Sequence, residues 1–216
     1  MYTRHMIYDH SIQGIFWLIV VLLFSIAFHE ATHAFVSHWL GDTTAAEEGR
    51  LTLNPVKHLD LYTSVLLPIV LSLLSLPPFF AAKPVPFNPY KIRFGAYGAA
   101  LIGVAGPFSN LLLAGVASAL FKVFMPTGVF ELILLIAVEL NIALFVFNMI
   151  PFPPLDGSRV LYAFAPEGVQ NVMYRIESGG FLSIFIFMFV LYPFLGPLVL
   201  NVDNALSKLL LGVSLF

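Results

Sequence analysis

Long apolar stretches dominate the chain, and polar or proline-rich segments separate them. A helix needs about 20 apolar residues to cross a bilayer, and four stretches meet that requirement. They lie at about 11–40, 96–124, 129–150 and 179–195, and the last is closed by Pro193, Gly196 and Pro197. The pattern predicts an all-α polytopic membrane protein. We expect a single integral-membrane domain over residues 1–216, because no repeat or linker divides the chain.

Three further segments are less regular. Residues 61–80 are apolar but carry three prolines, and residues 81–95 hold three more prolines, which favour an extended chain. Residues 198–213 place polar side chains at helical spacing opposite leucine and valine. This spacing predicts an amphipathic helix at the membrane interface or docked on the bundle.

The composition narrows the class of protein. Hydrophobic residues make up 59% of the chain and charged residues 10%, far from the balance of a water-soluble enzyme or a disordered segment. The formal net charge is −2, so we expect no nucleic-acid partner. The chain has no cysteine, so a transition-metal site must use His, Asp or Glu.

Residues 61–80 could cross the membrane once or could enter it and return on the same side. The distribution of Lys and Arg distinguishes these two paths. A single crossing divides the basic residues almost evenly between the two sides. A re-entrant path places seven on one side and two, Arg4 and Lys122, on the other, and basic residues favour the cytoplasmic side. We therefore expect the re-entrant path, with the N-terminus outside. The seven are Arg50, Lys57, Lys83, Lys91, Arg93, Arg159 and Arg175.

The first apolar stretch contains His29-Glu30-Ala31-Thr32-His33, an H-E-x-x-H sequence. On a helix the two histidines share one face, so both imidazoles can hold one metal ion. Glu30 can accept a proton from an attacking water. The alternative is a polar cluster that hydrogen-bonds neighbouring helices, although such a cluster is costly inside a membrane unless it is paired or liganded.

Asp156, in Pro151-Phe152-Pro153-Pro154-Leu155-Asp156-Gly157, is the best candidate for a third ligand. It follows an apolar span directly, where a break in the helix is tolerated if it is buried in protein or lines a cavity. Asp is also a common helix N-cap. The spacing alone leaves both roles open for Asp156.

Together these motifs resemble the site-2 protease family of intramembrane zinc metalloproteases. His29–His33 matches the family's first motif, Asn148–Gly157 its second, and Gly106-Pro107-Phe108-Ser109-Asn110 a Gly-x-x-x-Asn element on the middle core helix. The resemblance covers most of the chain and implies a three-helix catalytic core with additional membrane helices. No PDZ-like insertion or nucleotide-sensing tail is evident.

The resemblance implies one Zn²⁺ per chain, held by His29, His33 and Asp156, with Glu30 as the general base. It also implies that Asn148 and Asn110 hold the substrate or the oxyanion. The alternative is that these amides form hydrogen bonds between helices. The segment that contains Lys83, Pro84 and Val85 resembles an extended edge to which an unwound substrate adds as a strand. An ordinary loop is the alternative.

The function expected is that of an endopeptidase which cleaves in or near a transmembrane helix of a membrane-protein substrate, in regulated intramembrane proteolysis. We expect a prokaryotic cell membrane and an active site nearer the cytoplasmic face. Two alternatives are a metal-binding transporter or sensor without hydrolase activity and an inactive relative that acts as a partner. Glu139 lies inside the third span, either as a proton relay or as a neutral hydrogen-bonded group.

Overall fold

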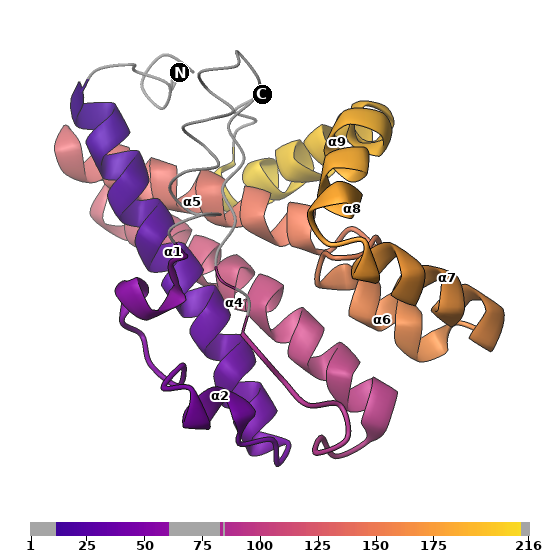
Figure 1. Cartoon of the computed structure of the whole chain (residues 1–216). Coiled ribbons are helices and arrows are strands. Elements are labelled where there is room, and N and C mark those ends of the chain that lie inside the picture. Colours follow the sequence, from indigo (N-terminus) through magenta and orange to yellow (C-terminus); the bar gives the residue numbers. More distant parts are fainter. Residues whose placement is uncertain (1–11, 61–82, 84, 213–216) are drawn as a thin grey trace.

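The computed structural model describes residues 12–60, 83 and 85–212 (Figure 1). Within these residues the regular structure is entirely helical, and four helices are long and apolar enough to cross a membrane. This confirms the predicted all-α polytopic class. The four are α1 (Ile12–Trp39), α4 (Gly95–Phe124), α5 (Val129–Asn148) and a last helix over Phe187–Leu211.

Shorter helices connect the long ones. Between α1 and α4 lie α2 (Thr44–Glu47) and the 3₁₀ turn η1 (Pro55–His58). After α5 the chain forms α6 (Gly157–Phe164), α7 (Glu167–Ser178), α8 (Phe181–Ile186), the π-helical turn η3 (Phe187–Leu191) and α9 (Tyr192–Leu211).

The helices α1 and α4 lie side by side (Figure 1) and run in opposite directions. The His33 ring on α1 bonds to the Ile102 carbonyl on α4. Two turns earlier on α1, the carbonyl of Ser25 accepts a bond from Asn110, which lies two turns later on α4. The C-terminal end of α1 and the N-terminal end of α4 therefore lie at the same end of the bundle.

The main apolar core lies between α4 and α5, and α9 covers part of it. Alanines on α4 allow the two helices to approach closely. The outward faces of the long helices carry exposed large hydrophobic side chains, as expected for surfaces in contact with lipid. The buried core residues are Ala114, Ala117, Phe121, Leu134, Leu135, Val138, Ile142 and Val146.

The prediction for the C-terminal region is wrong in one respect. Pro193, Gly196 and Pro197 do not end the helix, and the fourth span is Phe187–Leu211 instead of 179–195. Pro193 lies in the first turn of α9, where a missing backbone N–H leaves no bond unmade. Pro197 lies inside α9, and membrane helices tolerate such prolines.

The predicted amphipathic helix over 198–213 is part of α9, but its polar face does not lie at an aqueous surface. The side chains of Asp203 and Ser207 are buried, whereas Leu198 and Leu209 are exposed. The helix therefore directs Asp203 and Ser207 into the protein and Leu198 and Leu209 outward.

The residues that flank 61–82 are hydrogen-bonded to each other. The backbone N–H of Lys83 donates to the carbonyl of His58, and the Arg93 N–H donates to the Leu40 carbonyl. Arg50 donates to the carbonyl of Lys83. Both flanks thus lie at one end of the bundle. The predicted re-entrant path of 61–80 falls outside the described residues and stays a prediction.

Residues 85–88 form neither helix nor strand. The described residues therefore give the segment predicted to be extended, which we call the extended segment, no β-ladder. Its end is anchored to α1 by Asp42, which is fully buried. The Asp42 carboxylate accepts bonds from the Asn88 N–H at 2.6 Å, from Ser37 at 3.2 Å, and from both the N–H and the hydroxyl of Thr44.

These bonds set the charge state of Asp42. Burial alone would raise the pKa of Asp42, but the hydrogen bonds from Thr44, Asn88 and Ser37 outweigh burial and leave the pKa below its usual value. Because the pKa falls on folding, the carboxylate stabilises the fold at neutral pH. This contribution is lost as pH falls below about 4 and through the lowered pKa.

We predict that Asp42→Asn lowers the stability of the detergent-solubilised protein by about 1–3 kcal/mol at pH 7, because one buried charged acceptor is lost. The difference from the parent should shrink as pH falls below about 4. Thermal denaturation across pH 3–8 measures this. A difference that stays constant over that range would contradict the role of the Asp42 charge.

Candidate metal centre

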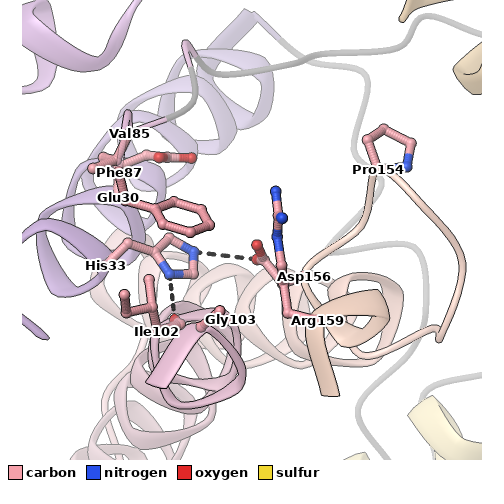
Figure 2. Close-up of a pocket in the computed structure, with 10 residues that line it drawn as sticks. Glu30, His33, Val85, Phe87, Ile102, Gly103, Pro154, Asp156 and Arg159 are labelled. Atoms are coloured by element: carbon pink, nitrogen blue, oxygen red, sulfur yellow. Dashed lines mark hydrogen bonds and ion pairs between the residues drawn. The ribbon is translucent and has the colours of Figure 1, made fainter. Parts of the chain in front are cut away.

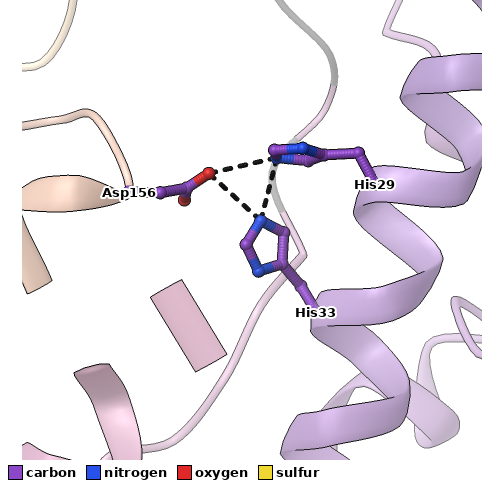
Figure 3. Close-up of side chains that lie close together, drawn as sticks. All are labelled: His29, His33 and Asp156. Atoms are coloured by element: carbon purple, nitrogen blue, oxygen red, sulfur yellow. Dashed lines mark hydrogen bonds and ion pairs between the residues drawn. The ribbon is translucent and has the colours of Figure 1, made fainter. Parts of the chain in front are cut away.

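Three side chains from separate parts of the chain converge at one point (Figure 3). His29 and His33 lie one turn apart on α1 and are 7% and 6% exposed. Their Nε2 atoms are 3.0 Å apart. The Oδ2 atom of Asp156 lies 3.0 Å from the Nε2 of His29 and 3.2 Å from that of His33.

Asp156 occupies the N-cap position of α6 but makes no capping hydrogen bond. Its carboxylate is turned toward the imidazoles instead, which favours the ligand role over the capping role. Burial alone would raise the pKa of Asp156. While the rings carry protons on Nε2, the charge of His33 and the hydrogen bonds from both rings hold that pKa well below its usual range, and a metal ion in place of those protons would supply the same positive charge. Asp156 is therefore ionised at neutral pH, as a metal ligand must be.

The far side of each imidazole is held by an acceptor. The His29 Nδ1 lies 2.6 Å from the Oδ1 of Asn110, and the His33 Nδ1 lies 2.7 Å from the carbonyl of Ile102. The Asn110 Nδ2 donates to Ser25 and to Asn141, so its Oδ1 is left to accept. Both Nδ1 atoms therefore carry the proton, and both Nε2 atoms present a lone pair to the Asp156 side.

The donor set and its spacing fit zinc. Four ligands at about 2.0–2.1 Å from a tetrahedral Zn²⁺ lie roughly 3.3 Å apart, close to the observed 3.0–3.2 Å. Two imidazoles and one carboxylate also leave one coordination position open, as in catalytic zinc sites. Among the described residues, no other group of three His, Cys, Asp or Glu side chains comes together in this way.

Gly106 on α4 makes room for the two rings. A Cβ atom at this position would lie 2.2 Å from the Nε2 of His33 and 2.7 Å from that of His29. Any other residue would push into the place where the lone pairs meet. Gly106 and Asn110 are one helical turn apart, so one face of α4 both admits the imidazoles and orients one of them.

The loop that carries Asp156 is also closely packed. A Cβ atom at Gly103 would lie 2.8 Å from the Asp156 carbonyl, and one at Gly157 would lie 2.3 Å from the Met149 carbonyl. The chain therefore turns tightly after α5 and lies against α4. This packing brings Asp156 to the histidines across more than 120 residues of sequence.

A pocket of about 100 Å³ opens beside the centre (Figure 2). Glu30 and His33 line one side, Asp156 and Arg159 the other, and Phe87 contributes from the extended segment. The pocket thus holds a carboxylate that is not one of the three converging groups. Val85, Ala99, Ile102, Gly103 and Pro154 complete the lining.

Arg159 lines the pocket, although the sequence pattern indicated only a basic residue that follows the third span. Its guanidinium carbon lies 4.8 Å from the centre of the Phe87 ring, and its Nη2 lies 2.6 Å from a carboxylate oxygen of Glu177. The signal in the sequence was its position three residues after Asp156, which places both on one face of the turn that begins α6.

The structure separates the remaining predicted site residues. Val85 lines the pocket, whereas Lys83 is exposed and Pro84 lies outside the described residues. Asn110 is fully buried and bonded to His29, Ser25 and Asn141, so its contacts are those of an orienting residue. Asn148 donates to the Leu144 carbonyl on its own helix and is not among the pocket-lining residues. Contact of either amide with a substrate stays a prediction.

Comparison with known proteins identifies relatives over most of the chain. "Putative zinc metalloprotease YwhC" of Bacillus subtilis is 36% identical over 183 residues, which cover 81% of this chain and 80% of YwhC. The chain belongs to the YwhC family. A second relative, "Putative zinc metalloprotease Rip2" of Mycolicibacterium smegmatis, is 28% identical over 181 residues, covering 82% of this chain and 69% of Rip2.

No family model matches the chain, and no solved structure matches it. Membership of the YwhC family therefore supports a metalloprotease assignment through the names of the relatives. The convergence of His29, His33 and Asp156 is an independent observation that agrees with those names.

We predict that Gly106→Ala abolishes stoichiometric zinc binding, because the added methyl group collides with both imidazoles. Gly115→Ala is the matched control, since a Cβ atom at Gly115 on the same helix meets nothing within 4 Å. Metal analysis of the purified proteins measures the effect. Full zinc content in Gly106→Ala would contradict the geometry of the centre.

Asn110→Ala should weaken zinc binding about 10–100-fold, because His29 loses the acceptor that fixes its ring and tautomer. Asn148→Ala should leave zinc affinity unchanged, since its amide bonds only within α5 among the described contacts. Competition with a chelator of known affinity measures both. Equal affinities in the parent and Asn110→Ala would show that Asn110 does not support the centre.

Proposed function

We propose that this chain is a zinc-dependent intramembrane endopeptidase similar to site-2 proteases, which hydrolyses a peptide bond in or beside a transmembrane helix of another membrane protein. The observation that carries the proposal is the meeting of two imidazoles and a carboxylate within a membrane-spanning bundle, with Glu30 in the adjoining pocket. Regulated intramembrane proteolysis is the process in which we expect it to act.

In this proposal His29, His33 and Asp156 hold one zinc ion. When bound, zinc supplies Lewis-acid chemistry, lowering the pKa of a water and polarising a carbonyl oxygen. Asn110 and the Ile102 carbonyl orient the two rings. Two neutral imidazoles and an ionised aspartate bind zinc better than they bind a hard cation, because a hard cation prefers oxygen ligands alone.

Glu30 is the proposed general base. It follows His29 on α1, lines the same pocket as His33 and Asp156, and is not one of the three converging groups. A carboxylate placed there accepts the proton of the attacking water and then delivers it to the leaving amine. A site for metal storage or transport has no need of this extra carboxylate.

The depth of the site supports a substrate within the membrane. The centre of the H-E-x-x-H sequence, Ala31, is about eight residues from the end of α1 at Trp39, or roughly 12 Å along the helix axis. A substrate backbone must reach this depth in an extended form, because a helix hides its peptide bonds. Helix-destabilising residues near the scissile bond should therefore favour cleavage.

The extended segment offers a place for the unwound substrate. Val85 and Phe87 line the pocket, and the Asp42 bond to Asn88 fixes the end of the segment. We propose that a substrate strand pairs with this segment and that Asn148 and Lys83 contact it. The distribution of basic residues supports our proposal that this end of the bundle lies at the cytoplasmic face of a prokaryotic cell membrane.

We predict that Glu30→Gln retains zinc but loses about 10²–10⁴-fold in cleavage rate, the usual contribution of a general base. Glu48→Gln, at an exposed carboxylate in the loop after α2, is the matched control. Both are incubated in detergent with single-span substrates carrying helix-destabilising residues, and products are identified by mass spectrometry. Each protein is also analysed for zinc.

Two outcomes would contradict the proposal. Cleavage by Glu30→Gln at the parent rate would remove Glu30 as the base. Zinc in both proteins with no cleavage by the parent, across substrates with and without a membrane span, would instead favour a non-hydrolytic metal-binding protein.

A further inference from the structure

A second polar cluster lies inside the bundle, on the contact between α5 and α9. Glu139 is near the middle of α5, and Asp203 and Ser207 lie one turn apart on the same face of α9. The Glu139 carboxylate lies beside the Ser207 hydroxyl and within electrostatic range of Asp203. Glu139 is 7% exposed, Asp203 5% and Ser207 0%.

Four buried side-chain oxygen atoms of this cluster have no hydrogen-bond partner among the described residues. This holds for both carboxylate oxygens of Glu139, for the Oδ1 of Asp203 and for the Oγ of Ser207. The ion pairs of the described residues involve neither carboxylate. Buried polar atoms are normally satisfied, and an exception points to an unassigned water or ion.

The surroundings increase the cost of leaving the two acids unpaired. The apolar core of α4 and α5 packs against this part of α9 through Leu206 and Leu210. Both carboxylates lie within helices that are long and apolar enough to span a membrane. Ionisable groups at such depth are costly without a partner and commonly mark a functional site.

The cluster is not part of the proposed zinc centre. Asn141, two residues after Glu139, bonds to Asn110 behind His29, so α5 presents one face to the histidines. Glu139 lies about 200° around the helix from Asn141, which directs it to α9. The donors also differ, because this cluster offers only oxygen atoms.

We propose that Glu139, Asp203 and Ser207 form a second cation site, which takes a hard metal cation and fastens α9 to α5. Carboxylate and hydroxyl oxygens are the ligands that hard cations prefer. One divalent ion of the Ca²⁺ class balances the two carboxylate charges, and Na⁺ shares the same ligand chemistry. The site explains why α9 turns Asp203 and Ser207 into the protein.

Equilibrium dialysis of the zinc-loaded, detergent-solubilised protein with ⁴⁵Ca²⁺ and, separately, with ²²Na⁺ tests this proposal. We expect the parent to bind one equivalent of one ion, with Ca²⁺ the stronger. Glu139→Gln and Asp203→Asn should weaken binding by at least tenfold, and Ser207→Ala, a milder change, several-fold. Zinc content reports that each variant is folded.

Glu131→Gln is the matched control, because Glu131 is also buried on α5 but lies two turns away from Glu139. It should bind the ion as the parent does. Saturable binding of neither ion by the parent would overturn the proposal and indicate carboxyl groups neutralised by protons. Equal binding by the parent and all three cluster variants would also overturn it.

Discussion

Two imidazoles and one carboxylate must share a small space inside a membrane-spanning bundle without an unsatisfied polar atom behind them. The Nδ1 protons of His29 and His33 are both used by acceptors on α4, so the lone pairs face Asp156. Each of these contacts depends on α4 lying close against α1. The approach of the two helices is therefore the constraint on which the rest of the site depends.

The two helices can approach each other because a short stretch of α4 has glycine where a side chain would not fit. Gly106 leaves space for both rings, and Gly103 lets the loop with Asp156 come against the same helix. At the end of the bundle, Asp42 fixes the extended segment that forms one wall of the pocket. Ligands, orienting groups and the pocket wall thus come from segments far apart in sequence but share α1 and α4 as a frame.

The sequence predicted the parts of this arrangement that are local. The first three spans agree with the structure because hydropathy and length decide them, and the H-E-x-x-H spacing places two imidazoles on one helical face. Contacts between helices that are far apart in the sequence could not be predicted in this way, because hydropathy and spacing describe one helix at a time. Asn110 was expected either at the substrate or as a hydrogen bond between helices, and the sequence did not predict its bond to His29. Asp203 and Ser207 were expected on the polar face of an amphipathic helix at the interface or docked on the bundle, and packing on α5 buries them.

Zinc K-edge X-ray absorption on the purified protein tests the central claim most directly. We predict two imidazole nitrogens and one carboxylate oxygen at about 2.0–2.2 Å, with one further light ligand in the open position. Replacing His29 by alanine should remove one imidazole contribution or the zinc itself. A spectrum with one imidazole or none in the parent, or one left unchanged by His29→Ala, would contradict the site described above.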